Sequence, residues 1–212
     1  MTETEVQPDI RQCIGDTRAQ SWCYLLVCPR TGDSAIVDPG GSPDEIMALA
    51  AGTHVRGIFI THGHRDHVGA VEEVRKGLKV PVWVHPGDIE RLPALPDSML
   101  TDRALLMVGE LRLAAIHTPG HTPGSTCLRV GDHLIAGDTL FPGGPGHTRS
   151  NVDFEEEVRS ITERLYSLPD HVVLHPGHGL PTTIGESRRE YEAFAARPRT
   201  PNLSGDVLWA SS

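Results

Sequence analysis

The segment Thr61-His-Gly-His-Arg-Asp-His67 concentrates four candidate metal ligands at the end of an apolar segment, residues 55–61. His62 and His64 are two positions apart, so their side chains point the same way if the backbone is extended. Asp66 and His67 begin the following helical pattern and present a second pair of donors. One tetrahedral ion cannot take all four donors from so short a turn. The spacing therefore favours two metal ions side by side.

Three more candidate ligands each lie in a glycine-containing turn after an expected strand. One catalytic metal ion needs about three protein ligands, so further donors must come from outside the first segment. Loops on a rigid scaffold commonly carry such residues. The candidates are His121 in His117-Thr-Pro-Gly-His-Thr-Pro-Gly-Ser125, Asp138 in Ala136-Gly-Asp-Thr-Leu140, and His178 in His175-Pro-Gly-His-Gly179.

Apolar periodicity and turn residues predict an order of elements that needs two sheets. In the first half we expect strands at 22–28, 34–38, 55–61 and 80–84, helices at 43–50 and 66–76, a short helix at 86–92 and a loop at 93–103. In the second half we expect strands at 104–108, 111–117, 125–130, 133–136 and 171–175, and helices at 154–167 and 184–196. The expected helix signals are Ser42 with Pro43, Asp66, Asp153 and Thr183 at the starts, and Gly77 at one end. Two sheets packed face to face, with helices outside, would bury both sheets.

Length and composition favour one folded domain. The chain has 212 residues, of which 38% are hydrophobic and 22% charged, as in globular proteins. We expect the domain to cover residues 1–197 and residues 198–212 to form a mobile tail. The four cysteines form no CxxC pair, so we expect free thiols that pack as small apolar groups.

Charge and hydropathy exclude several classes of partner. The 28 acidic and 19 basic residues give a formal net charge of −9, which disfavours binding to nucleic acid. We find no apolar run of about 18 residues, so we expect no contact with a membrane. The acidic, polar start of the chain, residues 1–9, does not resemble a secretory signal, and a cytoplasmic location follows as the expectation. We therefore expect a small-molecule substrate. The oligomeric state does not follow from the sequence.

The ordered donors resemble the pattern of the metallo-β-lactamase superfamily. The resemblance spans roughly residues 20–185, and its motifs are long and ordered. It implies an α/β fold, the four-layer αβ/βα sandwich, with the site at one edge. It also implies one metal ion on His62, His64 and His121, a second on Asp66, His67 and His178, and Asp138 as the bridge between them.

Within the superfamily, four shorter segments look like the glyoxalase II-like branch, which hydrolyses thioesters such as hydroxyacyl-glutathione. They are Thr118-Pro-Gly-His-Thr-Pro-Gly-Ser125, Gly137-Asp-Thr-Leu-Phe141, Pro176-Gly-His-Gly179 and Thr182-Thr-Ile-Gly-Glu186. The segment after His178 is too short for the helical domain that binds glutathione in full-length members. A compact single-domain relative is therefore expected, and glutathione as the thiol carrier is in doubt. Asp66 and Asp138 are the expected catalytic carboxylates.

The donors leave the metal and the substrate open. Zinc is the first expectation, and iron or manganese would also accept these ligands. Phe141, His147 and Arg149 are candidate substrate contacts, because their loop follows Asp138. Loops 17–22, 86–103 and 141–152 are expected to set specificity. The alternatives are a persulfide dioxygenase-like enzyme with one iron on His62, His121 and Asp138, a β-lactam or lactone hydrolase, and a nuclease, which the acidic charge disfavours.

Overall fold

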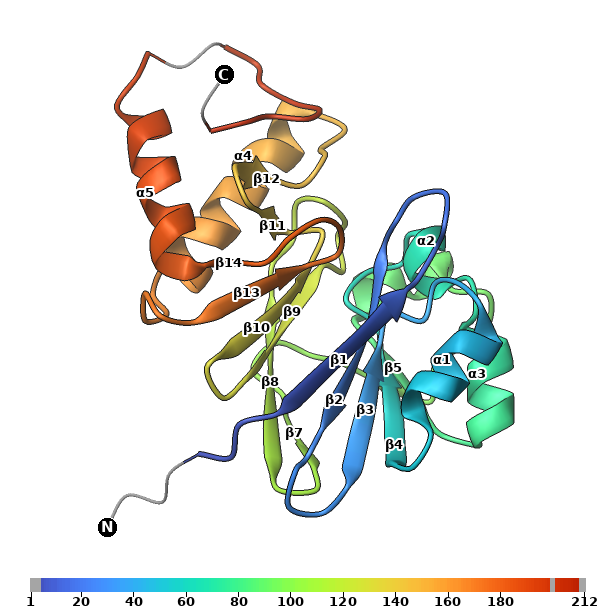
Figure 1. Ribbon diagram of the computed structural model, residues 1–212. Coiled ribbons are helices and arrows are strands. Elements are labelled where there is room, and N and C mark those ends of the chain that lie inside the picture. The colour runs from blue at the N-terminus through green and yellow to red at the C-terminus, as the bar shows by residue number, and fades with distance from the viewer. Residues whose placement is uncertain (1–4, 199–200, 210–212) are drawn as a thin grey trace.

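The computed structural model describes residues 5–198 and 201–209 and contains two six-stranded sheets packed face to face (Figure 1). The first sheet has the spatial order β1 (Asp9–Ile14), β2 (Trp22–Val27), β3 (Asp33–Val37), β4 (His54–Phe59), β5 (Val82–Val84) and β6 (Ser98–Met99). The second has the order β14 (Thr182–Thr183), β13 (Val173–Pro176), β10 (His133–Gly137), β9 (Thr126–Val130), β8 (Leu111–His117) and β7 (Leu105–Val108). A small hairpin joins β11 (Leu140–Phe141) to β12 (Gly144–Pro145).

Helices cover the outer face of each sheet (Figure 1). The helices beside the first sheet are α1 (Pro43–Ala50), α2 (Arg65–Val68) and α3 (Val71–Leu78), with a 3-10 helix at Pro86–Arg91. The second sheet is covered by α4 (Asn151–Ser160), which continues as a π-helical turn at Ile161–Leu165, and by α5 (Ile184–Ala195). The predicted four-layer sandwich is confirmed, because each sheet lies between the other sheet and its own helices.

Three apolar clusters fill the three spaces between the four layers. Strand β2 shows how the sequence builds them, because successive side chains of a strand point to opposite faces. Cys23 and Leu25 pack with α1 and α3, whereas Tyr24 and Leu26 pack against the second sheet. The third cluster lies between the second sheet and its helices and includes Phe154. Both sheets are thus buried on both faces, which explains their long apolar runs.

The helix that we predicted at 66–76 is wrong in its boundaries. It is broken into α2 and α3, because the Ala70 N–H donates to the carbonyl of Pro39 (2.9 Å) instead of continuing the helix. Asp66 lies inside the first turn of α2, after His64, and Gly77 lies inside α3. Lys79, with φ 56°, ends α3 in the left-handed conformation.

Other boundaries also differ from the predictions. Ser150, rather than Asp153, caps α4, because its hydroxyl accepts the Asp153 N–H (3.2 Å). Thr183 caps α5 as predicted. Strand β6 lies within the predicted loop 93–103, and β1 was not predicted. Strand β1 is an edge strand whose residues are mostly exposed, so it lacks the apolar alternation that marks the others.

The expectation of a mobile tail is wrong for residues 201–209. Val207 and Trp209 are buried in the third apolar cluster, and the Trp209 N–H donates to the carbonyl of Gly143 (2.7 Å). Residues 199–200 and 210–212, and the first four residues of the predicted acidic start, lie outside the described part of the chain. A domain limited to residues 1–197 would therefore leave out part of the core.

The cysteines are free, as expected, and three of the four are buried. Within residues 5–198 and 201–209, no helix is both long enough and apolar enough to cross a lipid bilayer.

Candidate metal centre

Loops at one edge of the sandwich bring all seven predicted donors together. His62, His64, Asp66 and His67 follow β4, and His121 lies between β8 and β9. Asp138 and His178 follow β10 and β13, two neighbouring parallel strands whose carboxyl ends therefore meet at the same edge. The packed strands fix the starting points of these loops, so the donors occupy a rigid frame.

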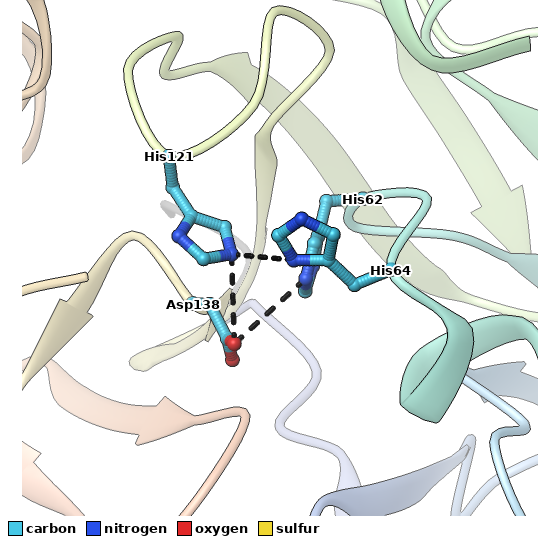
Figure 2. A group of neighbouring side chains, drawn as sticks. All are labelled: His62, His64, His121 and Asp138. Atoms are coloured by element: carbon cyan, nitrogen blue, oxygen red, sulfur yellow. Dashed lines mark hydrogen bonds and ion pairs between the residues drawn. The ribbon is translucent and has the colours of Figure 1, made fainter. Parts of the chain in front are cut away.

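One group of donors consists of three histidines and Asp138, which point toward one another (Figure 2). His64 Nδ1 lies 2.9 Å from His121 Nε2. Asp138 Oδ2 lies 3.6 Å from His121 Nε2 and 3.8 Å from His62 Nε2. The donor atoms of all four residues lie within 4.8 Å of one another, a spacing that could hold a metal ion.

A second group consists of Asp66, His67 and His178. Asp66 Oδ2 lies 3.3 Å from His67 Nε2 and 3.2 Å from His178 Nε2. Asp138 reaches this group as well, because its Oδ1 lies 3.5 Å from His67 Nε2 and its Oδ2 lies 3.4 Å from His178 Nε2. The Asp138 carboxylate therefore lies within 3.8 Å of donors in both groups.

Two observations, besides the chemistry of the ligands, show that these residues fit metal ions. His62 Nε2 and Asp138 Oδ1 are buried and lack a hydrogen-bond partner, which is costly unless another group satisfies them. Gly177 leaves the space beside the carboxylate open, since a Cβ there would lie 2.1 Å from Asp138 Oδ1. Imidazole nitrogens and carboxylate oxygens are ligands that zinc, iron and manganese accept.

Hydrogen bonds behind the donors fix how the imidazole rings are oriented. His121 Nδ1 lies 2.9 Å from the carbonyl of His147, and His178 Nδ1 lies 3.0 Å from the carbonyl of Ala19. His67 Nδ1 lies 3.1 Å from Asp38 Oδ2. In the neutral form of each ring, the nitrogen that faces the carbonyl or carboxylate is placed to donate its proton, which would leave the other nitrogen for a cation.

Asp38 is a site residue that sequence reasoning missed. Its Oδ1 accepts the Thr61 N–H (2.7 Å) and its Oδ2 accepts the Thr61 hydroxyl (2.5 Å), besides facing His67. Asp38 therefore orients His67, and its carboxylate also forms a third group of candidate ligands with His62 and His67, all within 4.8 Å of one another. The signal in the sequence was a carboxylate at the end of a strand, in Asp38-Pro-Gly-Gly41, which we interpreted only as a turn.

Asp88 is the second missed residue and connects two of the donor-bearing loops. Its Oδ2 accepts the Gly63 N–H and the Thr122 hydroxyl, each at 2.7 Å, and its Oδ1 accepts the Gly124 N–H at 3.0 Å. Gly63 lies between His62 and His64, and Thr122 follows His121. One fully buried carboxylate therefore sets the distance between the two loops.

The electrostatics of the first group favour neutral imidazoles. Burial lowers the pKa of His62 well below its ordinary value and lowers the pKa of His64 to about 4. Burial also lowers the pKa of His121. Neutral imidazole is the form that binds metal, because a protonated ring has no lone pair to offer.

The carboxylates, in contrast, stay ionised. Burial opposes the charge of Asp138, but the positive charge of His67 and a hydrogen bond with His178 hold its pKa well below the ordinary value. Burial likewise opposes the charge of Asp66, and hydrogen bonds with His178 and His67 hold its pKa low. Burial would lower the pKa of His178, yet hydrogen bonds with Asp138 and Asp66 raise it to about 10. The two carboxylates therefore favour positive charge at this position.

A hollow of about 330 Å³ opens beside the donors, and two of the three predicted substrate contacts line it. Phe141 and His147 lie in its wall, together with His121, Asp138 and His178. Arg149 is exposed and is not among the lining residues, so the structure gives it no place beside the donors.

Comparison with known proteins places this arrangement in a family. The model of the metallo-β-lactamase superfamily matches residues 16–202, which is most of the chain. The chain belongs to the metallo-β-lactamase superfamily. Its fold is therefore that of this superfamily of metallo-hydrolases. A hydroxyacylglutathione hydrolase from Anaeromyxobacter dehalogenans (strain 2CP-C) is 39% identical over 183 residues, covering 84% of this chain and 70% of that protein.

Two solved structures of similar proteins share the fold of this chain. The crystal structure of the B3 metallo-β-lactamase BLEG-1 has a TM-score of 0.78 and 28% sequence identity, and the match covers 85% of this chain and 96% of that one. The crystal structure of TTHA1623 in a di-iron-bound form has a TM-score of 0.67 and 29% identity, covering 83% of this chain and 96% of that one.

Proposed function

We propose that the protein hydrolyses small-molecule thioesters, and related esters or lactones, at a site that holds two divalent metal ions. The observation that carries the proposal is Asp138, whose carboxylate lies within 3.8 Å of donors from both groups. A carboxylate in that position would be available as a ligand to both ions. The ligands would be His62, His64 and His121 for one ion, Asp66, His67 and His178 for the other, and Asp138 for both.

The bound ions would supply a water of lowered pKa and would polarise the carbonyl oxygen that gains charge in the transition state. Asp66 is placed to orient the attacking water, because its carboxylate is ionised and partly accessible. Asp138 would keep the two cations close, since its buried negative charge offsets their repulsion. The hollow beside His121 and His178 would receive the substrate.

The thioester is the proposed substrate because the curated relative with 39% identity is named a hydroxyacylglutathione hydrolase. The likeness to BLEG-1 adds a β-lactam as a second compound to assay. Zinc is the proposed metal on ligand chemistry, and the di-iron form of TTHA1623 makes iron the competing candidate.

A mononuclear iron oxidoreductase is the alternative that uses only part of the donor set. His62, His121 and Asp138 would suffice for it, but His64, and the second group as well, would then have no metal to bind. Four convergent donors without a function are costly in a buried, charged site. The complete set therefore favours the dinuclear hydrolase.

Metal analysis of purified protein, combined with assays of thioesters, lactones, phosphodiesters and a β-lactam, tests the proposal. We expect two ions per chain and turnover of a thioester. Asp66→Ala should abolish that turnover while the circular dichroism spectrum persists. His171→Ala is the control, because His171 is an exposed histidine at the start of the β13 segment, away from the donors. One iron per chain with oxygen consumption, or full turnover by Asp66→Ala with full metal content, contradicts the proposal.

A further inference from the structure

Residues near the end of the described chain form part of the wall of the hollow beside the donor groups. Val207 and Leu208 line it together with Phe141 and Pro142 from the β11–β12 hairpin. None of these residues belongs to a donor group. The lining of the hollow therefore combines polar residues, which include His121, Asp138 and His178, with these apolar residues.

Contacts on both sides hold the apolar wall in place. Before it, Thr148 and Gly205 exchange two backbone hydrogen bonds (2.8 and 3.3 Å), which add this segment to the loop after Asp138. After it, Trp209 is 1% exposed and packs against Phe194 of α5, with ring centroids 4.8 Å apart. Residues 206–208 thus span a short distance between two fixed points, and their positions follow from those anchors.

Within this segment, the side chain of Leu208 is only partly buried. It is 52% exposed, although its neighbours Val207 and Trp209 are both buried. An apolar group that enters the hollow beside Leu208 would remove part of this side chain from contact with water.

The apolar residues of the hollow disfavour a charged group that lies against them. Among the described residues that line the hollow, none is a lysine or an arginine. Asp206 accepts a hydrogen bond from His147 (Nδ1–Oδ1, 3.0 Å), and both side chains are exposed. A carboxylate that packs against Val207, Leu208 and Phe141 would lose water without gaining a hydrogen bond in return.

We propose that residues 206–208 form the substrate-selecting wall of this site, and that the acyl group of the substrate is uncharged and apolar. The proposal rests on the hydrolase function proposed above and names the class of its substrate. The acyl chain lies against Val207, Leu208 and Phe141, while the carbonyl carbon faces the donor groups. Selectivity among acyl groups then comes from the apolar contact and from the cost of removing a charged group from water against that wall.

Kinetics on thioesters of one neutral thiol, N-acetylcysteamine, test the wall. The acyl groups compared are acetyl, pentanoyl and succinyl, because pentanoyl and succinyl have similar lengths and differ in charge. We expect the wild type to favour pentanoyl over both others by tenfold or more in kcat/KM. Leu208→Ala should reduce the pentanoyl-to-acetyl ratio about tenfold, the range for a few methylene contacts in a pocket. Leu208→Lys should reduce the pentanoyl-to-succinyl ratio by more than tenfold.

The control is Leu105→Ala, because Leu105 is a leucine of the same 52% exposure on β7, and it does not line this hollow. We expect both ratios to stay within twofold of the wild type in that variant. If the wild type hydrolyses thioesters but both ratios are unchanged in the Leu208 variants, the wall proposal is overturned and the hydrolase function stands.

A binding measurement separates the two proposals if the wild type hydrolyses no thioester. Calorimetry with the ketone analogues, in which a methylene group replaces the thioester sulfur, does not depend on turnover. Tighter binding of the pentanoyl than of the succinyl analogue, reduced about tenfold by Leu208→Ala, supports the wall even when the thioester function fails. Equal binding of the two analogues to the wild type overturns the wall.

Discussion

Asp88→Asn should weaken metal binding although Asp88 touches no donor atom. The carboxylate is fully buried and accepts hydrogen bonds from Gly63, Thr122 and Gly124. Those three residues belong to the loops that carry His62, His64 and His121. The substitution keeps the size of the side chain but replaces one acceptor oxygen with an NH₂ group. That group would face an N–H donor, so one loop must move away.

The magnitude follows from the bonds that are lost. A hydrogen bond to a charged acceptor contributes about 1.5–3 kcal/mol, and a buried donor left unsatisfied adds a further penalty of about 1–3 kcal/mol. We expect the free energy of unfolding of the metal-free protein to fall by about 2–4 kcal/mol. For a chain of this length the melting temperature should then fall by roughly 5–15 °C. Metal affinity should fall by about 10- to 100-fold, the usual effect of losing a group that positions the ligands.

Chelator competition measures the metal affinity, and urea unfolding of the metal-free protein measures stability. Asp97→Asn is the matched control, because Asp97 also accepts a backbone N–H, from Val82 (2.9 Å), and an arginine, Arg75. Asp97 lies beside α3 and, among the described residues, makes no hydrogen bond with a loop that contains a metal-ligand candidate. We expect Asp97→Asn to lose stability and to keep its metal affinity. If Asp88→Asn loses stability as the control does but keeps the metal affinity of the wild type, Asp88 does not position the metal ligands.

Three further predictions concern single residues. His64→Ala should lower the metal content from two ions to one per chain and the turnover at least 100-fold, measured by elemental analysis and thioester assay; two ions retained would contradict the ligand role. Burial raises the pKa of Glu157 well above its ordinary value, so the neutral carboxyl is favoured in the folded protein. The stability that the neutral carboxyl contributes is present at low pH and is lost as pH rises. Glu157→Gln should therefore stabilise the protein by about 1–3 kcal/mol at pH 8 and by little near pH 4, in urea titrations at both pH values; an equal effect at both would refute this. Trp209→Ala should cost about 3–5 kcal/mol of unfolding free energy, whereas a free tail would give no change.

The donors were predictable from the sequence because metal binding needs particular atoms. Only a few side chains offer imidazole nitrogens or carboxylate oxygens, and each of the seven follows a strand with a clear apolar pattern. His62, His121 and His178 all occur beside glycines that let the loop turn. The strands themselves, β2 to β5 and β7 to β10, were predictable within a few residues, because burial on both faces requires apolar runs.

The groups that support the donors were not predictable in this way. Asp38 and Asp88 accept backbone N–H groups of loops that lie far away in the sequence, so their partners exist only after folding. An aspartate at a turn has many local explanations, and nothing in its neighbours distinguishes the buried one. The two-residue strands β6 and β14 have the same origin, since they are defined by their pairing with longer strands rather than by their own residues.

The residues of the substrate wall were the least predictable from the sequence, for a physical reason. An apolar wall needs only a few methyl groups, which many residues supply, and any segment with an anchor can deliver them. Here the segment contains Pro201, Asn202 and Gly205, so its sequence resembles a tail, and its place in the fold is shown by its contacts, above all the burial of Trp209. Chains that share all seven donors can therefore differ in substrate through three residues that no metal-ligand motif includes. Metal binding constrains the sequence strongly, whereas substrate choice constrains it weakly. The anchored wall at Leu208 therefore says more about the acyl group than the donor motif does.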